Sequence, residues 1–326
     1  MKVFVSGATG FIGSHLVKAL ASNGYIVHAL YRSESKINEL NHPNVRLFKG
    51  DILNFQSLEK AMEGCTQAYH VAAFANIWEK DPSIIYRLNI EGSMNVIKAA
   101  IKNNVEKIVC TSTAGVLGPS DNHPLNEDSP PPSSFFIDYE SSKAILEKIL
   151  ITMSLTGPEI IIVNPTRVYG PGLLSESNSV TRMIEKYIRG KWRFIPGSGN
   201  SKGNYVHVKD VVKGHILAME KGRNGERYLL GGENVSYLEF FNTLSEVSGK
   251  KYFLLKIPLF VMLGISHIVM LKTYLFGTKP MITPPLARKF NHNFNITSEK
   301  AVKELGYSPL SLKKGLEDTL NWLKNI

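Results

Sequence analysis

Short apolar runs alternate with helical patterns through the first half of the chain. The runs are rich in β-branched residues and bounded by polar residues or glycine, which is the pattern of buried strands. They predict strands at Val3–Val5, Tyr25–Tyr31, Val45–Phe48, Ala68–Val71, Lys107–Thr111 and Glu159–Val163. Apolar residues at helical spacing predict the intervening helices at Gly13–Asn23, Ser57–Met62, Ile84–Asn103 and Ser141–Met153. Strands that alternate with helices form βαβ units, so we expect an α/β fold with a doubly wound parallel sheet of the Rossmann type.

The regular alternation ends near Pro171, and loops rich in glycine, serine and asparagine follow. A strand and helix pattern then returns near residues 205–230. We therefore expect a Rossmann domain over residues 1–172 that includes this return segment. Residues 173–204 and 231–326 are expected to form a smaller, interleaved C-terminal lobe.

The most apolar stretch of the chain is Phe253–Leu271. It is interrupted by Lys256, Pro258 and His267, so it falls short of the roughly 18 uncharged residues that a spanning helix needs. We therefore expect no integral membrane span, and we predict a helix that lies in the core or covers a pocket. A helix on a membrane surface is the alternative.

Composition and charge narrow the classes of function. The 326 residues are 43% hydrophobic and 20% charged, as in folded globular proteins. The formal charge of +10 comes from basic residues spread along the chain, which predicts a soluble surface rather than a nucleic-acid site. Cys65 and Cys110 match no metal-ligand spacing, so we expect reduced thiols and no metal. The N-terminus reaches Gly7 before an apolar signal segment could form, which favours a cytoplasmic location.

Three glycines stand between the first predicted strand and the first predicted helix. Gly7 suits the tight turn, Gly10 leaves space for a diphosphate close to the backbone, and Gly13 allows close packing of helix on strand. The N–H groups and the dipole of the helix N-terminus then favour an anion. This position in a βα series predicts a dinucleotide site.

The glycine spacing is G-x-x-G-x-x-G, and with it the chain resembles the extended branch of the short-chain dehydrogenase/reductase superfamily. Within that branch it is similar to dihydroflavonol-4-reductase-like proteins of the NAD-dependent epimerase/dehydratase group, including bacterial hopanoid-associated sugar epimerase-type proteins. The resemblance implies contacts to the adenine edge from Asp51 and Ile52. It also implies contacts along the rest of the dinucleotide from Gly7, Thr9, Gly10, Phe11, Ile12, Ala72, Pro165 and Val168.

The end of the second predicted strand indicates which dinucleotide is bound. NAD enzymes usually place an acidic residue there to bind the ribose hydroxyls. Here that position is Tyr31, and Arg32 follows with a planar guanidinium suited to a phosphate. We therefore predict NADP(H), with support from Lys36, and NAD(H) as the alternative.

Tyr139 and Lys143 form a Y-x-x-x-K pair, and four-residue spacing puts both on one face of a helix. A nearby ammonium lowers the pKa of a tyrosine, which would then exchange a proton with a carbonyl oxygen. The resemblance implies that Lys143 also holds the nicotinamide ribose. It implies a third catalytic hydroxyl at Thr113, with Ser112 as the alternative.

The leading hypothesis is an NADP(H)-dependent oxidoreductase that reduces a ketone or aldehyde. Epimerases of this branch commonly carry an arginine for the sugar-nucleotide diphosphate where this chain has Gly203. Four aromatic residues on loops after strand ends, together with the apolar segment Phe253–Leu271, suggest a hydrophobic carbonyl substrate, namely Phe74, Trp78, Phe135 and Phe136. The alternative is that these aromatic residues pack the core between the lobes. The alternatives are a nucleotide-sugar epimerase or dehydratase and a non-catalytic dinucleotide-binding regulator. By analogy with the family, the chain is expected to form a homodimer.

Overall fold

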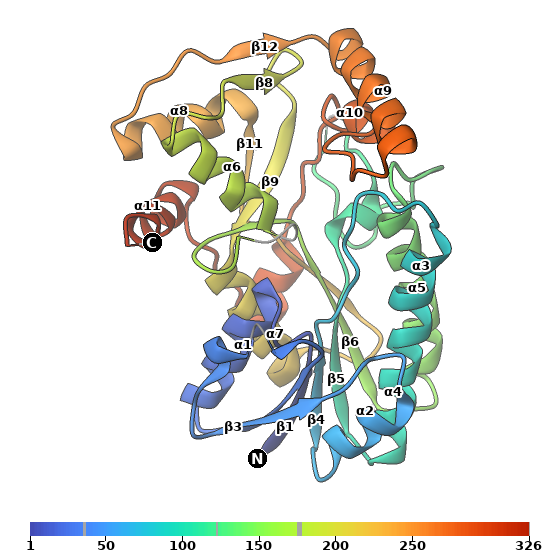
Figure 1. Cartoon of the computed structure of the whole chain (residues 1–326). Coiled ribbons are helices and arrows are strands. Elements are labelled where there is room, and N and C mark those ends of the chain that lie inside the picture. Colours follow the sequence, from blue (N-terminus) through green and yellow to red (C-terminus); the bar gives the residue numbers. More distant parts are fainter. Residues whose placement is uncertain (35–36, 122, 175–177, 326) are drawn as a thin grey trace.

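The computed structural model describes residues 1–34, 37–121, 123–174 and 178–325. Figure 1 shows a sheet flanked by helices at the N-terminal end of the molecule and a second, more irregular lobe above the sheet. The expected alternation of strands and helices is confirmed through the first half of the chain.

The main sheet has seven strands, all paired in parallel, in the order β10-β6-β5-β4-β1-β2-β3. This order reverses next to β1, as in doubly wound folds that bind ligands at the carboxyl edge of the sheet. The Rossmann prediction is therefore confirmed. The strands are β1 (Lys2–Ser6), β2 (Ile26–Tyr31), β3 (Val45–Lys49), β4 (Gln67–His70), β5 (Lys107–Thr111), β6 (Glu159–Pro165) and β10 (Arg227–Leu230).

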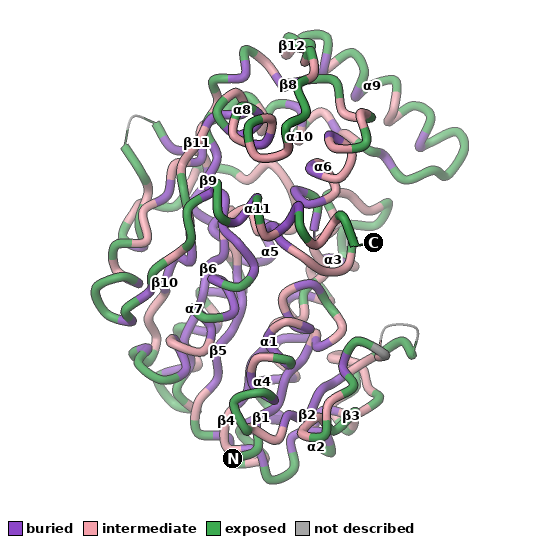
Figure 2. Tube along the Cα trace, turned by 90° about the vertical axis from the view of Figure 1, so that its left-hand side faces the viewer, coloured by how far each residue is buried: buried purple, intermediate pink, exposed green. Residues whose placement is uncertain are grey.

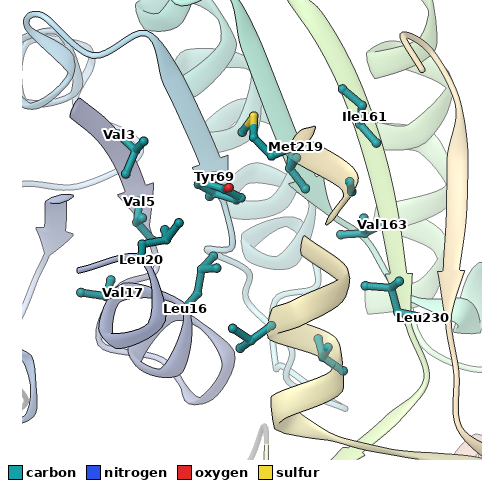
Figure 3. Packing of buried hydrophobic residues seen from close by; sticks show 14 of the residues in the cluster. Val3, Val5, Leu16, Val17, Leu20, Tyr69, Ile161, Val163, Met219 and Leu230 are labelled. Carbon is teal, nitrogen blue, oxygen red and sulfur yellow. The ribbon is translucent and has the colours of Figure 1, made fainter. Parts of the chain in front are cut away.

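Helices cover both faces of the sheet and bury two apolar clusters against it. One face carries α1 (Phe11–Ser22) and α7 (Val208–Lys221), whose apolar residues join those of β1 and β6 (Figure 3). The other face carries α2 (Phe55–Met62), α4 (Gly92–Lys102) and α5 (Asp138–Met153). Cys65 and Cys110 are buried in this second cluster and form no disulfide. Burial on both faces explains why the strands are continuously apolar.

The helix predicted at Ile84–Asn103 is divided. It consists of α3 (Ser83–Tyr86), a π-helical turn at Arg87–Glu91 and α4. The π-helical turn carries Asn89, which is buried and turned toward the loop that follows β4. The periodicity of the sequence could not show this interruption, because apolar residues continue across it at helical spacing.

The second lobe is built on two small sheets. One has the order β11-β9-β7 and the other pairs β12 with β8. Its strands are β7 (Arg167–Tyr169), β8 (Phe194–Pro196), β9 (Lys202–His207), β11 (Glu233–Ser236) and β12 (Leu255–Ile257). Its helices are α6 (Ser179–Ile188), α8 (Tyr237–Ser248), α9 (Leu259–Phe276), α10 (Pro284–Lys289) and α11 (Leu312–Leu323). An aromatic-rich cluster packs α6, α8 and α11 together.

The apolar segment predicted at Phe253–Leu271 forms a helix, but this helix is α9, which begins at Leu259 and ends at Phe276. Only 17% of its residues are buried. The expectation of a core helix is therefore wrong, and Figure 2 shows this helix as largely exposed. By length and composition it is the one helix in the described residues that could cross a membrane.

Candidate functional site

The glycine turn forms a tight cradle between β1 and α1. Gly7 has a φ of +70°, and a Cβ there would lie 2.6 Å from the backbone nitrogen of Ala72. A Cβ on Gly13 would lie 2.0 Å from the Gly7 carbonyl oxygen. The N-cap residue of α1 is Gly10, which offers no side chain to cap the first N–H groups of the helix. Thr9, Phe11 and Ile12 lie in and directly after this turn, so the backbone here fits a diphosphate group.

The carboxyl ends of β2 and β3 lie beside this turn. Arg32 directly follows β2, and its guanidinium lies 3.9 Å from a carboxylate oxygen of Asp51 after β3. The Asp51 carboxylate also accepts a hydrogen bond from Leu53 N–H at 2.9 Å. Ile52 packs against the backbone of Gly92 at the start of α4. Lys36 lies outside the described residues.

Tyr139 and Lys143 lie one turn apart on α5. Lys143 is fully buried, and its Nζ donates a 2.9 Å hydrogen bond to the Thr111 carbonyl at the end of β5. Burial lowers the pKa of Lys143 to about 8. The pKa of Lys143 is therefore close enough to neutral pH for its ammonium to give up and regain a proton.

The structure contradicts the prediction that Lys143 lowers the pKa of Tyr139. Burial, together with the negative charge of Glu140, raises the pKa of Tyr139 well above its ordinary value. The physical reason is that desolvation penalises a phenolate more than it penalises a phenol. In this protein Tyr139 is therefore held in its protonated form.

Thr113 and Ser112 follow β5 but face different surroundings. Thr113 Oγ1 accepts a 3.1 Å hydrogen bond from Gly115 N–H and lines a cavity of ≈ 180 Å³ together with Tyr139. Ser112 is buried, and its hydroxyl has no hydrogen-bond partner among the described residues. Because a threonine hydroxyl that accepts one hydrogen bond still has its proton to donate, Thr113 can bind a carbonyl oxygen in this cavity.

The cavity also contains an arginine that sequence reasoning missed. Arg167, on β7, donates to the hydroxyl of Tyr205 at 3.0 Å and to that of Tyr237 at 3.3 Å. Its guanidinium lies over Gly203, where a Cβ would come within 2.3 Å of it. The guanidinium of Arg167, from another strand, thus fills the space where residue 203 would carry a side chain. In the sequence, Gly203 itself was the hint of this contact, because a larger residue there would exclude Arg167.

Glu140 and Lys289 form an ion pair at the wall of the same cavity. Glu140 comes from α5, one residue after Tyr139, whereas Lys289 comes from α10 in the second lobe. Nothing in the sequence indicates this pairing, since the two residues are far apart in the chain and lie in different elements.

Asn89 connects the loops around the cavity. Its side chain accepts from Phe74 N–H at 2.8 Å and donates to the Phe74 carbonyl and to Ser142 on α5. Ala72 lies against Gly7, and Pro165 ends β6. These contacts hold the loop after β4 against the helix that carries Tyr139.

The predicted substrate aromatics separate into different surroundings. Phe136 packs against His292 and Phe294, and Phe294 lines the cavity. Trp78 instead packs edge-on against Tyr274 of α9, with ring centroids 6.4 Å apart. Phe74 and Phe135 are both half-buried, and Val168 lies in the middle of β7.

A family model for the NAD dependent epimerase/dehydratase family matches residues 3–231. The chain belongs to this family. The resemblance to extended short-chain dehydrogenases/reductases is therefore confirmed. The matched range runs from β1 to the end of β10, so it contains the whole main sheet and the Tyr139–Lys143 pair.

Known proteins resemble the chain over nearly its full length. A Synechocystis protein provisionally named a dihydroflavonol 4-reductase is 32% identical, with 99% of this chain and 94% of that protein covered. Sterol demethylase protein B of Methylococcus capsulatus is 31% identical over 99% and 98% of the two chains. The solved UDP-glucuronic acid 4-epimerase of Bacillus cereus, in complex with UDP-glucuronic acid and NAD, is 26% identical with a TM-score of 0.81, over 100% and 99%.

Proposed function

We propose that this protein is an NADP(H)-dependent oxidoreductase that reduces a ketone or aldehyde. One observation carries the proposal: Tyr139 and Thr113 line the same cavity, at the carboxyl edge of a sheet whose first turn fits a diphosphate. The dinucleotide, when bound, would supply the hydride. The similarity to a protein provisionally named a reductase supports this class of reaction.

The protonation state of the cavity favours reduction. Burial keeps Tyr139 as a neutral phenol, which can donate a proton to the carbonyl oxygen as the hydride reaches the carbon. Thr113 can hold the same oxygen with its free O–H. Lys143 has a pKa of about 8 and is anchored to Thr111, so it can return a proton to Tyr139 after each turnover. Each residue therefore has a role that its surroundings allow.

Replacement of Tyr139 by phenylalanine tests the proposal directly. We expect Tyr139→Phe to reduce kcat by about 10²–10⁴-fold, because general acid catalysis is lost, while NADPH affinity stays unchanged. Turnover of a panel of ketones and aldehydes would be followed through NADPH absorbance, and NADPH affinity by fluorescence titration. Tyr25→Phe, at the opposite edge of the sheet, is the matched control.

Full activity in Tyr139→Phe would overturn the catalytic assignment. Tight NADPH binding by the wild-type chain without turnover of any carbonyl compound in the panel would favour the non-catalytic regulator instead.

Arg167 supports a second candidate, a nucleotide-sugar epimerase. The guanidinium over Gly203 places a bidentate donor near the position that the epimerases of this branch use for diphosphate, and it forms no ion pair among the described residues. An epimerase would be purified with NAD bound in a one-to-one ratio, and UDP-glucose would raise its melting temperature. An Arg167→Met variant would lose that rise but keep its binding of dinucleotide.

A further inference from the structure

The surface of α9 and of the segments next to it exposes an unusual amount of apolar side chain. Half of the large apolar side chains that are exposed in the described residues lie within residues 253–281. They are Phe253, Leu255, Phe260, Val261, Ile265, Ile268, Leu271, Tyr274, Leu275, Phe276 and Met281. We call this set the α9 patch. Such a concentration of exposed apolar side chains in one segment normally marks an interaction site.

Most of the patch lies on the outward face of α9, whose inner face is already packed. Met262, Ser266 and Thr273 recur at helical spacing and are the buried residues of α9. Phe260, on the opposite face, is 75% exposed, and Ile268 on that face is 70% exposed. The described residues therefore cover one side of α9 and leave the other side largely exposed, and Figure 2 shows most of this helix as exposed with a few buried residues along it.

The charged residues of the same segment indicate what kind of surface the α9 patch binds. From Val247 to Ser298 the chain contains no aspartate and no glutamate. The same stretch carries the basic residues Lys250, Lys251, Lys256, Lys272, Lys279, Arg288 and Lys289. Lys251, Lys256, Lys272 and Lys279 are exposed and form no ion pair among the described residues. An exposed apolar surface on a segment that carries lysines and no acidic residue complements a bilayer with anionic headgroups.

Both ends of α9 are attached to other elements of the second lobe. These attachments limit how the helix can contact a bilayer. Before α9, strand β12 pairs with β8. After it, α10 packs against α9, and Lys289 of α10 pairs with Glu140 of the Rossmann domain. A helix that crossed the bilayer would need one of these ends on the far side. The attachments therefore favour a helix that lies along the membrane surface.

We propose that α9 binds this protein to the surface of an anionic lipid bilayer, with the α9 patch at the boundary of headgroups and acyl chains. The exposed lysines would then lie at the level of the phosphates, where long basic side chains extend toward the headgroups. Tyr274 of the patch packs on Trp78, and α10 carries Lys289 into the cavity wall. The bound protein therefore holds its cavity next to the membrane. This proposal does not depend on the reaction that the cavity catalyses.

Cosedimentation of the full chain with vesicles tests the proposal. We expect binding to vesicles of phosphatidylcholine with 30 mol% phosphatidylglycerol, at least about tenfold weaker binding to pure phosphatidylcholine, and weakening by salt. Phe260→Ser/Ile268→Ser/Leu271→Ser should lower the partition coefficient at least about tenfold, since apolar burial is lost. Leu47→Ser/Ile101→Ser/Leu155→Ser is the matched control, because it changes the same number of exposed apolar residues elsewhere.

A tryptophan placed on α9 adds a second measurement. Because the chain already contains three tryptophans, the emission of Ile268→Trp is compared with that of the wild type, and it should shift further to the blue when phosphatidylglycerol vesicles are added, as the added indole leaves water. No binding by the wild-type chain, equal loss of binding in the control variant, or no blue shift would overturn the proposal. So would a stable dimer in analytical ultracentrifugation that the α9 triple variant dissociates, because the patch would then face a second copy.

Discussion

At the scale of single residues, the proposed choice of NADP over NAD rests on Arg32. Its side chain is 74% exposed, and Asp51 is a distant partner at 3.9 Å. An exposed ion pair of that length holds a guanidinium weakly, so the guanidinium of Arg32 remains available to bind the 2′-phosphate of NADP. Tyr31, at the end of β2, offers no carboxylate for the ribose hydroxyls of NAD. The proposed NADP preference therefore rests on Arg32 among the described residues.

Removal of this guanidinium should change cofactor choice without affecting the fold. We expect Arg32→Met to raise the KM for NADPH by about 10–100-fold, because charge-assisted hydrogen bonds contribute about 1.5–3 kcal/mol. The KM for NADH should stay within about twofold. Arg46→Met, which removes the same charge from β3, is the control. A wild-type preference for NADH would contradict this account of Arg32.

At the scale of elements, the turn between β1 and α1 is packed too closely to admit a side chain at Gly7 or Gly13. Gly13 lies on the first turn of α1, directly against the Gly7 carbonyl. Gly7 itself lies against Ala72, at the end of β4. The turn thus fixes the helix N-terminus relative to two strands at once, which is what a diphosphate site requires.

A methyl group at this turn should disturb both stability and binding. We expect Gly13→Ala to lower the free energy of unfolding by about 1–3 kcal/mol, because the new Cβ displaces the Gly7 peptide. NADPH affinity should fall with it. Gly264→Ala is the matched control, since no atom lies within 4 Å of a Cβ on this α9 glycine. That variant should gain up to about 1 kcal/mol from helix propensity. Chemical denaturation distinguishes the two, and equal effects would refute the packing argument.

At the scale of the whole molecule, the two lobes are joined at the cavity by Lys289 and Glu140. The Glu140 side chain is only 3% exposed, and that of Lys289 is 19% exposed. A carboxylate this deeply buried depends on its partner, because desolvation strongly disfavours an unpaired charge. The same pair attaches α10, and with it the end of α9, to the helix that carries Tyr139.

A double-mutant cycle should reveal this dependence. We expect Lys289→Met to lower the free energy of unfolding by about 3–5 kcal/mol, because it leaves Glu140 buried without a partner. Glu140→Gln/Lys289→Met should recover most of that loss, since the buried charge is gone. The free energies would be measured by urea denaturation. If the double variant is no more stable than Lys289→Met, the ion pair does not join the lobes in solution.

The sequence alone determined the Rossmann architecture, the position of the glycine turn and the shared helix of Tyr139 and Lys143. These features are local: apolar periodicity, glycine spacing and four-residue spacing on a helix all act over one or two elements. They survive folding because all of the predicted strands join the main sheet and most of them are buried between its two helical layers.

The tertiary structure alone decided the chemistry of the cavity and the character of α9. Arg167 and Lys289 reach the cavity from other elements, and no spacing along the chain encodes contacts of that kind. The pKa of Tyr139 rises because burial and the negative charge of Glu140 disfavour the phenolate, and burial is a property of the fold. From the sequence, the apolar residues of α9 are as consistent with a core helix as with a surface helix. Their exposure was settled by the packing of one face against the lobe, which leaves the other face to the surroundings.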